Sequence, residues 1–239
     1  MNDKLQSESD RRYPWLASML QTVDPLFPIG SYAHSYGLEE MTAMGKVTNE
    51  NELTQFLDII VRLSLSHFEL PYLRYTYYSQ TKEEWEEVIQ LDHEIGASKL
   101  SKEARTASAT QGRQRLLLLK KLKPSQSFTT LANLQSGNKI APHHITIFAA
   151  ERIQEFTPIE ATLTAWAYQA LAAPCTASLK IMRIGQEGAQ RALTQAIKSI
   201  PNLISKSLEI ERDWAGAFNP LIDIASDRHD RAYARLFIS

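Results

Sequence analysis

The stretch that decides the fold is TPIEATLTAWAYQALAA, residues 157–173. It opens with TPIE, a helix-start signal in which a capping threonine precedes a proline at the first helical position and a reciprocal glutamate. The remainder is apolar on nearly every side of a helix, a pattern typical of a helix buried at the centre of a domain. We therefore expect a central helix over 157–173, an interruption at Pro174, and a further helix carrying Cys175 to Ile184.

Two patterns outside this stretch also indicate helices. Asn49 and Glu52 resemble a capping box, and Thr81 with Glu84 forms a second signature of this kind, whose helix is closed by Gly96. The first signature precedes apolar residues at helical spacing: Leu53, Phe56, Leu57, Ile60 and Leu63. Both signatures therefore predict helices that start close to these residues.

Residues that break regular structure are few, with 9 glycines and 10 prolines among 239 residues. This composition favours long helices over a turn-rich sheet protein. Strand-like clusters are confined to Tyr75–Tyr78 and His144–Phe148, and no repeat or linker divides the chain. We predict a single all-α domain, a bundle of about ten helices, over residues 15–239 after a flexible polar N-terminus at 1–14. We also expect Lys120–Ser127 to be mobile.

Charge and cysteine content exclude several classes of protein. The chain carries 26 lysines and arginines against 27 aspartates and glutamates, a net charge of −1. Such a balance lacks the basic footprint of a protein that binds nucleic acid or an anionic membrane. A single cysteine, Cys175, excludes an internal disulfide framework and a cysteine-based zinc cluster. The polar opening residues are unlike a signal peptide, and no run of about 18 apolar residues occurs, so we expect a cytoplasmic protein.

Candidate catalytic groups are sparse. The six histidines are His34, His67, His93, His143, His144 and His229. None belongs to an HExxH pair, and the chain has no phosphate-binding loop, GxGxxG or GxSxG motif. Pro142 indicates that a helix begins at the adjacent pair His143-His144, where we expect one ring to cap the helix and the other to pack. Cys175 lies among apolar neighbours, as a small buried hydrophobic residue does.

A distinctive segment is PLFPIGSYAHSYGLE, residues 25–39. Its prolines and glycine favour a stiff tight turn, after which Ser31 can cap a helix. In that helix Tyr32 and Tyr36 would share a face, being four residues apart. Gly37 is unfavourable inside a helix, so we expect it to mark the close approach of another backbone, with a buried helix crossing as the simplest explanation.

A second segment, EARTASATQGRQR at residues 103–115, has small and polar residues at helical spacing: Ala104, Ala107, Ser108, Gln111 and Arg115. The charged residues Glu103, Arg105 and Arg113 do not lie on one face of this helix. A solvated basic helix is the alternative interpretation.

Together these segments resemble the UreF family of urease accessory proteins. The string FPIGSYAHSYGLE, residues 27–39, carries most of the resemblance. An ExRxxSxxxG arrangement formed by Glu103, Arg105, Ser108 and Gly112 supports it in the same order. The region from Tyr168 through Ser178-Leu179-Lys180 to Gln186 and Gln190, and the ending Tyr233–Ser239, extend the resemblance to roughly residues 16–239.

The resemblance implies an all-α homodimer that is not an enzyme and needs no cofactor of its own. Family members act between the scaffold UreD, also called UreH, and the GTPase UreG, in the assembly that inserts nickel into apo-urease. Nickel is therefore cargo for the client enzyme. The alternative is a metal-dependent helical enzyme that uses His34, His67, His143 or His144 with acidic partners.

We expect the partner-binding residues to include Tyr32, Tyr36, Glu39, Tyr168, Lys180, Tyr233, Arg235, Leu236 and Phe237. Lys180 follows the apolar residues Ala177 and Leu179, where an ammonium group is unfavourable unless it is paired or faces an aqueous cavity. A surface lysine whose stem packs on apolar neighbours is the alternative.

The C-terminal tail, residues 227–239, combines aromatic side chains with Arg235, a composition found in interface hot spots. The resemblance implies that this tail docks onto UreD/UreH. We expect it to be mobile in the isolated protein and ordered in the complex, with Arg235 as its anchor.

Overall fold

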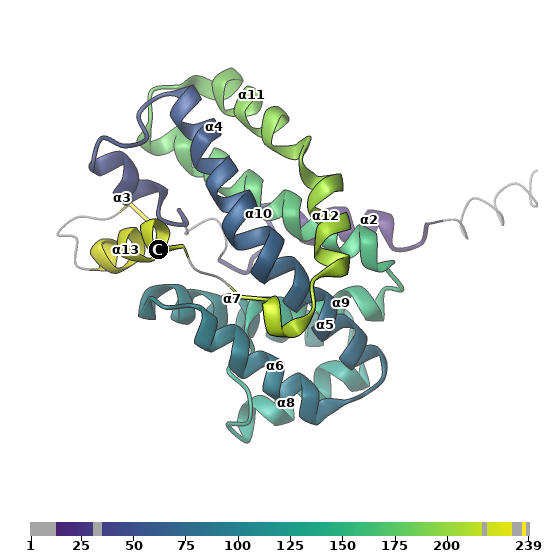
Figure 1. Ribbon diagram of the computed structural model, residues 1–239. Helices are drawn as coiled ribbons and strands as arrows, with labels where there is room; N and C mark the ends of the chain where they lie inside the picture. The colour runs from purple at the N-terminus through teal and green to yellow at the C-terminus, as the bar shows by residue number, and fades with distance from the viewer. Residues whose placement is uncertain (1–12, 31–34, 217–218, 231–235, 238–239) are drawn as a thin grey trace, which may run out of the picture.

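All regular structure is helical in the part of the chain that the computed structural model describes, residues 13–30, 35–216, 219–230 and 236–237. The predicted all-α class is confirmed (Figure 1). The α-helices are α2 (Leu16–Val23), α3 (Leu38–Ala43), α4 (Glu50–Ile59), α5 (Leu70–Thr81), α6 (Trp85–Ser98), α7 (Lys102–Leu122), α8 (Gln126–Ser136), α9 (His144–Gln154), α10 (Ile159–Ile181), α11 (Gly185–Ile197), α12 (Ile200–Glu209) and α13 (Pro220–Asp230). A π-helix, η2 (Ile60–Glu69), joins α4 to α5, and a 3₁₀ turn, η3 (Arg212–Trp214), follows α12.

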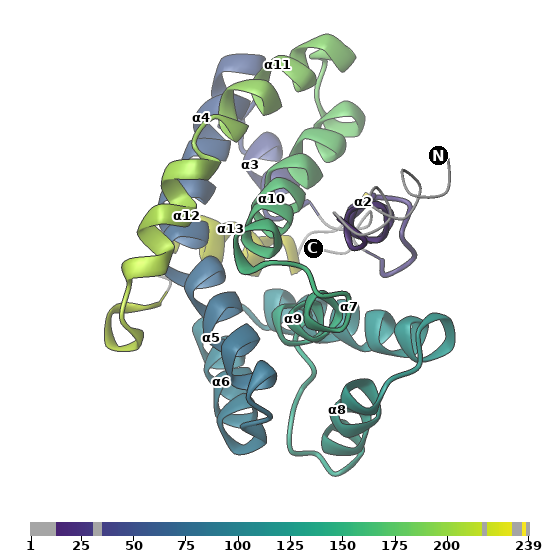
Figure 2. The ribbon, with the colours of Figure 1, turned by 90° about the vertical axis from the view of Figure 1, so that its right-hand side faces the viewer.

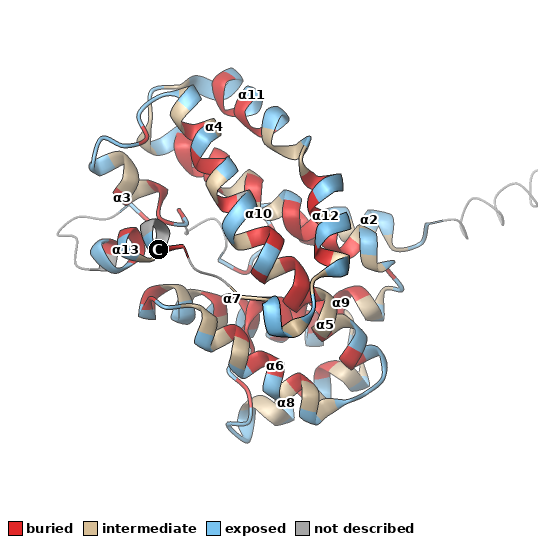
Figure 3. Cartoon of the chain, viewed as in Figure 1, coloured by how far each residue is buried: buried red, intermediate tan, exposed pale blue. Residues whose placement is uncertain are grey.

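The helices form two groups that share one long rod. The rod consists of α4, η2 and α5, which follow one another without a break. Helix α11 packs beside α4, and α10 and α12 contact both η2 and α5. Helices α6 and α9 pack on the other sides of α5, and α7 and α8 pack on α9 (Figure 2). Buried residues face the interior of both groups (Figure 3). A large apolar core fills the first group and extends to α6 and α9, and a smaller cluster lies between α6, α7, α8 and α9. Among the helices described, none is long and apolar enough to cross a membrane.

Helix α10 is the predicted central helix, and it contacts α2, α3, α4, α5, α11 and α12. The predicted interruption at Pro174 is wrong, because the helix runs on to Ile181. Proline cannot donate a backbone hydrogen bond there. Buried neighbours on both sides, Leu171 and Cys175 among them, hold the helix together through packing. The predicted cap is also wrong: Pro158 is the N-cap, and the buried Thr157 hydroxyl has no hydrogen-bond partner.

The capping box at the start of α4 is confirmed, since the Glu52 backbone N–H donates to Asn49 Oδ1 at 3.1 Å. The Glu52 carboxylate accepts from the backbone and hydroxyl of Thr48 rather than from Asn49. Four of the five residues on the predicted apolar stripe are buried, but Leu63 is 41% exposed. The reason is that η2 follows a π-helical path, whose wider turn changes which residues share a face.

The two strand-like clusters are helical, in agreement with the all-α prediction: Tyr75–Tyr78 lies in α5 and His144–Phe148 in α9. Two local predictions are wrong. Thr81 is the last residue of α5, and its hydroxyl donates to the Tyr77 carbonyl, so it does not cap α6. Gly96 does not close α6, which continues to Ser98. Aromatic and β-branched side chains form helices in the two clusters because all of them except the exposed Tyr78 are buried or partly buried.

The segment Lys120–Ser127, expected to be mobile, comprises the end of α7, a short connection and the start of α8. Lys123, inside this connection, forms an ion pair with Glu155 and a hydrogen bond with Ser18. These contacts attach the connection to both α2 and the end of α9. The expectation overlooked them because the partners are distant in the sequence.

Candidate functional site

Helix α7 crosses the start of α9 at a close approach of the two backbones, beside the site. A Cβ atom added to Gly112 would lie 1.9 Å from the Pro142 carbonyl oxygen and 2.9 Å from the His144 backbone nitrogen. Only glycine fits at this position. The helix interior expected around Gly37 is wrong, since α3 begins at Leu38. Gly37 is instead the N-cap of α3, with a left-handed φ of 82° that favours glycine.

His143 lies directly beside this crossing, at the N-cap of α9. Its backbone N–H donates to Asp92 Oδ1 at 2.9 Å, and its Nδ1 is 3.2 Å from Ser108 Oγ. The imidazole also packs on Gly96, where an added Cβ would be 2.7 Å from Nε2. Burial lowers the pKa of His143, so the ring is neutral. The predicted helix start is confirmed, but the ring forms no cap hydrogen bond.

A fully buried ionic cluster ties α7 and α9 to α2. The Arg115 Nε–H donates to Glu151 Oε2 at 2.6 Å, and Arg152 Nη2 forms a 3.0 Å ion pair with Glu151 Oε1. Both arginines also reach Thr22 on α2, one at the carbonyl oxygen and the other at the hydroxyl. His144 Nε2 lies 3.1 Å from Arg115 Nη1. Because a guanidinium can only donate, this nitrogen accepts and the His144 ring is neutral.

A second polar cluster attaches the C-terminal tail to α3 and α7. His229 on α13 is 1% exposed and lies between two carboxylates, 2.9 Å from Glu39 and 3.0 Å from Glu103. The Glu39 carboxylate also accepts the backbone N–H groups of Leu236 and Phe237, at 2.8 and 3.0 Å. Burial alone would lower the pKa of His229, but its hydrogen bonds and charge interactions with both glutamates raise it. We call these five residues the tail latch.

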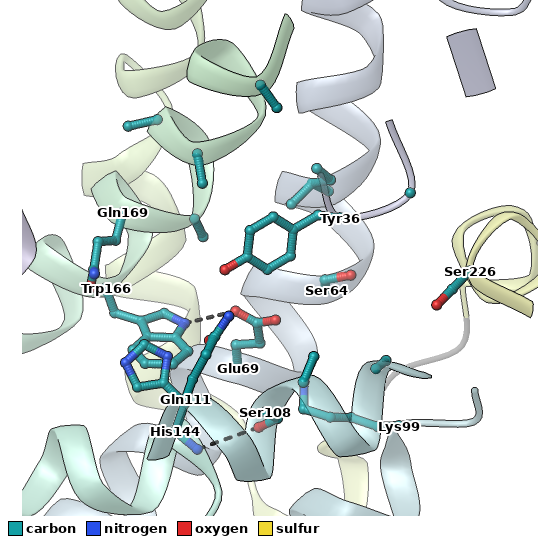
Figure 4. Close-up of a pocket in the computed structure, with 18 of the residues that line it drawn as sticks. Tyr36, Ser64, Glu69, Lys99, Ser108, Gln111, His144, Trp166, Gln169 and Ser226 are labelled. Atoms are coloured by element: carbon teal, nitrogen blue, oxygen red, sulfur yellow. Dashed lines mark hydrogen bonds between the residues drawn. The ribbon is translucent and has the colours of Figure 1, made fainter. Parts of the chain in front are cut away.

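A cavity of about 200 Å³ lies between α10, η2, α7 and the tail (Figure 4). The Trp166 indole N–H donates to Glu69 Oε2 at 2.7 Å inside it. The Tyr36 ring reaches across the cavity towards these two side chains (Figure 4). Burial and the charge of Glu69 raise the pKa of Tyr36 to about 12, so the phenol stays protonated. His144 and Gln111 complete the wall between these residues and the α7–α9 crossing.

The structure brings six of the nine expected partner-binding residues to the cavity or to the tail latch. Tyr36, Tyr168, Lys180 and Phe237 line the cavity, whereas Glu39 and Leu236 belong to the tail latch. The exposed Lys180 places Nζ 5.3 Å from the centre of the buried Phe237 ring, a cation–π contact. Tyr32, Tyr233 and Arg235 lie outside the described residues.

Tyr36 is not part of a helix, although we expected it inside one that begins at Ser31. α3 begins at Leu38, and Tyr36 precedes it with a φ of 55°. Tyr36 therefore does not present a helical face. Ser31 itself is outside the described residues, while Gly30 has the positive φ of 83° expected of a tight turn.

The histidines proposed as metal ligands form no metal site within the described part of the chain. Residues 13–30, 35–216, 219–230 and 236–237 contain no group of three histidine, cysteine, aspartate or glutamate side chains able to hold a metal ion. His67 is exposed and bonds locally to Ser66, and His34 lies outside the described residues. Cys175 is buried, and burial raises the pKa of its thiol to about 12, so it is not a nucleophile at neutral pH.

The distinctive sequence segments thus form helix crossings and line a cavity, and comparison with known proteins identifies the family. The sequence model of the UreF family matches residues 47–197, more than half of the chain. This chain belongs to the UreF family.

Similar curated proteins extend the match beyond that range. The urease accessory protein UreF of Actinobacillus pleuropneumoniae serotype 5b (strain L20) is 26% identical over 224 residues, covering 94% of this chain and 99% of that protein. The proteins of the same name from Bacillus sp. (strain TB-90) and Teredinibacter turnerae are 26% and 27% identical, with equal coverage of this chain. Similarity to proteins named UreF therefore extends over nearly the whole of the chain that forms the cavity and the tail latch.

Several residues of this UreF-family site escaped prediction from the sequence. Glu69 and Trp166 meet inside the cavity, although they are 97 residues apart. One signal could have revealed Glu69: it is a carboxylate in the apolar run FELPYL, residues 68–73. Asn219, also in the cavity wall, carries no comparable signal.

Proposed function

We propose that this UreF-family protein is a non-catalytic adaptor that joins the scaffold UreD/UreH to the GTPase UreG in the cytoplasm while nickel enters apo-urease. The observation that carries this proposal is the alignment of 94% of the chain with proteins named urease accessory protein UreF. In this role nickel is cargo, and the chain contributes binding surfaces rather than reacting groups.

The use of the buried histidines supports a non-catalytic role. His143 and His144 are neutral, and each has a ring nitrogen occupied, by Ser108 and Arg115 respectively. His229 is bonded at both nitrogens, to Glu39 and Glu103. A metal at any of these occupied nitrogens would have to displace a hydrogen bond that connects two helices, which disfavours the metal-enzyme alternative.

The tail is the surface that we assign to the scaffold. Its described part combines a buried anchor, Phe237, with Leu236, which is 71% exposed. The backbone N–H groups of Leu236 and Phe237 both donate to Glu39, which holds this part of the tail in place. The exposed Leu236 side chain is therefore suited to contact a partner, because little entropy is lost when it binds. We further propose that two copies of this chain form a homodimer, so that the assembly has two such tails.

Reconstitution with purified partners tests the adaptor role. UreD/UreH, UreG and this chain are mixed in pairs and together, and complexes are sized by light scattering after gel filtration. We expect UreG to join the scaffold only when this chain is present. The proposal is refuted if UreG and the scaffold associate equally well without it, or if this chain binds neither.

A further inference from the structure

The cavity contains buried polar atoms for which the described fold provides no partner. Asn219 is 4% exposed and lines the cavity, yet neither its Oδ1 nor its Nδ2 has a hydrogen-bond partner. Gln169 on α10 lines the same cavity, and its buried Oε1 is also unpartnered. Buried amide groups are nearly always hydrogen-bonded. Two such side chains, from different elements and on one cavity, indicate a ligand that supplies the missing partners.

The size and charge of the cavity limit the class of ligand. A volume of about 200 Å³ exceeds the roughly 150 Å³ that holds a benzene molecule in an engineered protein cavity. The charged residues around it balance, with Glu69 and Asp223 against Lys99 and Lys180. Much of the wall is formed by alanines: Ala104, Ala107, Ala170, Ala172, Ala173 and Ala177. A neutral ligand with one aromatic-sized apolar group and an amide fits these properties.

The tail shows how this site holds an aromatic residue. The Phe237 ring is buried at the cavity wall under the Lys180 ammonium group. The main-chain N–H of Phe237 donates to the Glu39 carboxylate. The remaining space therefore lies next to an aromatic ring that is already bound through its side chain and its main chain.

We propose that this space binds one aromatic residue of a partner protein, with its ring among the alanines and its main-chain amide paired with Asn219. An asparagine side chain presents one acceptor and one donor group on the same side, and so do the N–H and C=O of one residue in an extended backbone, so the two can form complementary hydrogen bonds. The identification of the occupant as an assembly partner rests on the proposed adaptor function. The chemical class of the ligand, a neutral aromatic amide, does not rest on that function.

The test uses the full-length chain and N-acetyl-L-phenylalaninamide, followed by ligand-observed NMR and titration calorimetry. We expect saturable binding with a Kd on the order of 1 mM, given the small size of the probe. N-acetylglycinamide, which lacks the ring, should not bind. Asn219→Ala should weaken binding by about tenfold or more, whereas Asn202→Ala, an exposed asparagine on α12, should not.

Thermal unfolding of the same variants excludes a purely structural explanation. Because the Asn219 amide has no partner in the free protein, Asn219→Ala should unfold at the same temperature as wild type or higher. Ala173→Leu, which fills the cavity, should abolish binding while the near-UV circular dichroism stays native. Absence of saturable binding, equal binding by Asn219→Ala, or a lower unfolding temperature for Asn219→Ala than for Asn202→Ala would overturn the proposal.

Urease activation measured in parallel separates the two proposals. A wild-type chain that does not support activation contradicts the adaptor function, whatever the probe does. A wild-type chain that supports activation but does not bind the probe contradicts only the aromatic-residue site.

Discussion

Removing the Glu151 carboxylate should destabilise the buried ionic cluster that ties α7 and α9 to α2. Glu151 lies between Arg115 and Arg152, and all three side chains have zero exposure. The substitution Glu151→Ala leaves two guanidinium groups in the interior without the carboxylate between them. Loss of one partner from a buried ion pair lowers stability by about 3–5 kcal/mol. For a chain of this size, that corresponds to an unfolding temperature about 6–20 °C lower.

Urea denaturation followed by far-UV circular dichroism measures this change as a free energy of unfolding. Glu151→Gln serves as a milder variant, because it keeps an acceptor oxygen but removes the charge, and it should lose less stability. Glu187→Ala is the control: its side chain is 94% exposed and lies 3.5 Å from Arg191, so its removal should change stability by less than about 0.5 kcal/mol.

The substitution also has a local consequence that the structure predicts. Arg115 and Arg152 both donate to Thr22, so disorder of the guanidinium groups should loosen α2. Hydrogen exchange of residues 16–23 should therefore accelerate in Glu151→Gln more than in Glu187→Ala. A loss of less than about 1 kcal/mol in Glu151→Ala, with unchanged exchange of α2 in both variants, would refute the reasoning.

Three further predictions concern pH, the tail and the oligomer. The pKa of His229 is raised in the folded protein above its ordinary value of 6.5. The contacts of protonated His229 with Glu39 and Glu103 should therefore contribute their full stability below about pH 6.5 and lose it as the pH rises through the folded value. Urea titrations of wild type and His229→Gln from pH 6 to 9 should converge at the alkaline end, and a constant difference would contradict this. Deleting residues 232–239 should preserve the helical circular dichroism but weaken capture of UreD/UreH, and Arg235→Ala should weaken it as well; unchanged capture by the deletion would show that the tail is not the docking segment. Light scattering should give roughly 54 kDa, twice the 27.1 kDa chain, and a monomer mass at micromolar concentration would exclude the homodimer.

The helical class and most of the core were predictable from the sequence because they depend on local periodicity. Leu53, Phe56 and Leu57 repeat at helical spacing and are buried as expected. Predictions failed where tertiary packing outweighed a local preference. Pro174 remains inside a helix because both of its flanks are packed, and Leu63 left the buried stripe because η2 is a π-helix.

The candidate site was predictable only in part, because its contacts join distant residues. Family resemblance brought attention to Glu39 and Phe237, but no spacing rule indicates that they are in contact across 198 residues. The same limit applies to the 93-residue separation between Thr22 and Arg115. Asn219 is informative only once its surroundings are known, since an asparagine before a helix ordinarily serves as a cap.

Complementation in cells tests the central claim, that this chain is required for urease maturation, most directly. In a bacterium that produces urease, the gene for this chain is deleted and then restored on a plasmid, and urease activity, urease nickel content and urease subunit levels are measured. The account predicts that deletion abolishes activity and nickel content while subunit levels stay constant, and that the plasmid restores both. Full urease activity with normal nickel content in the deletion strain would contradict it.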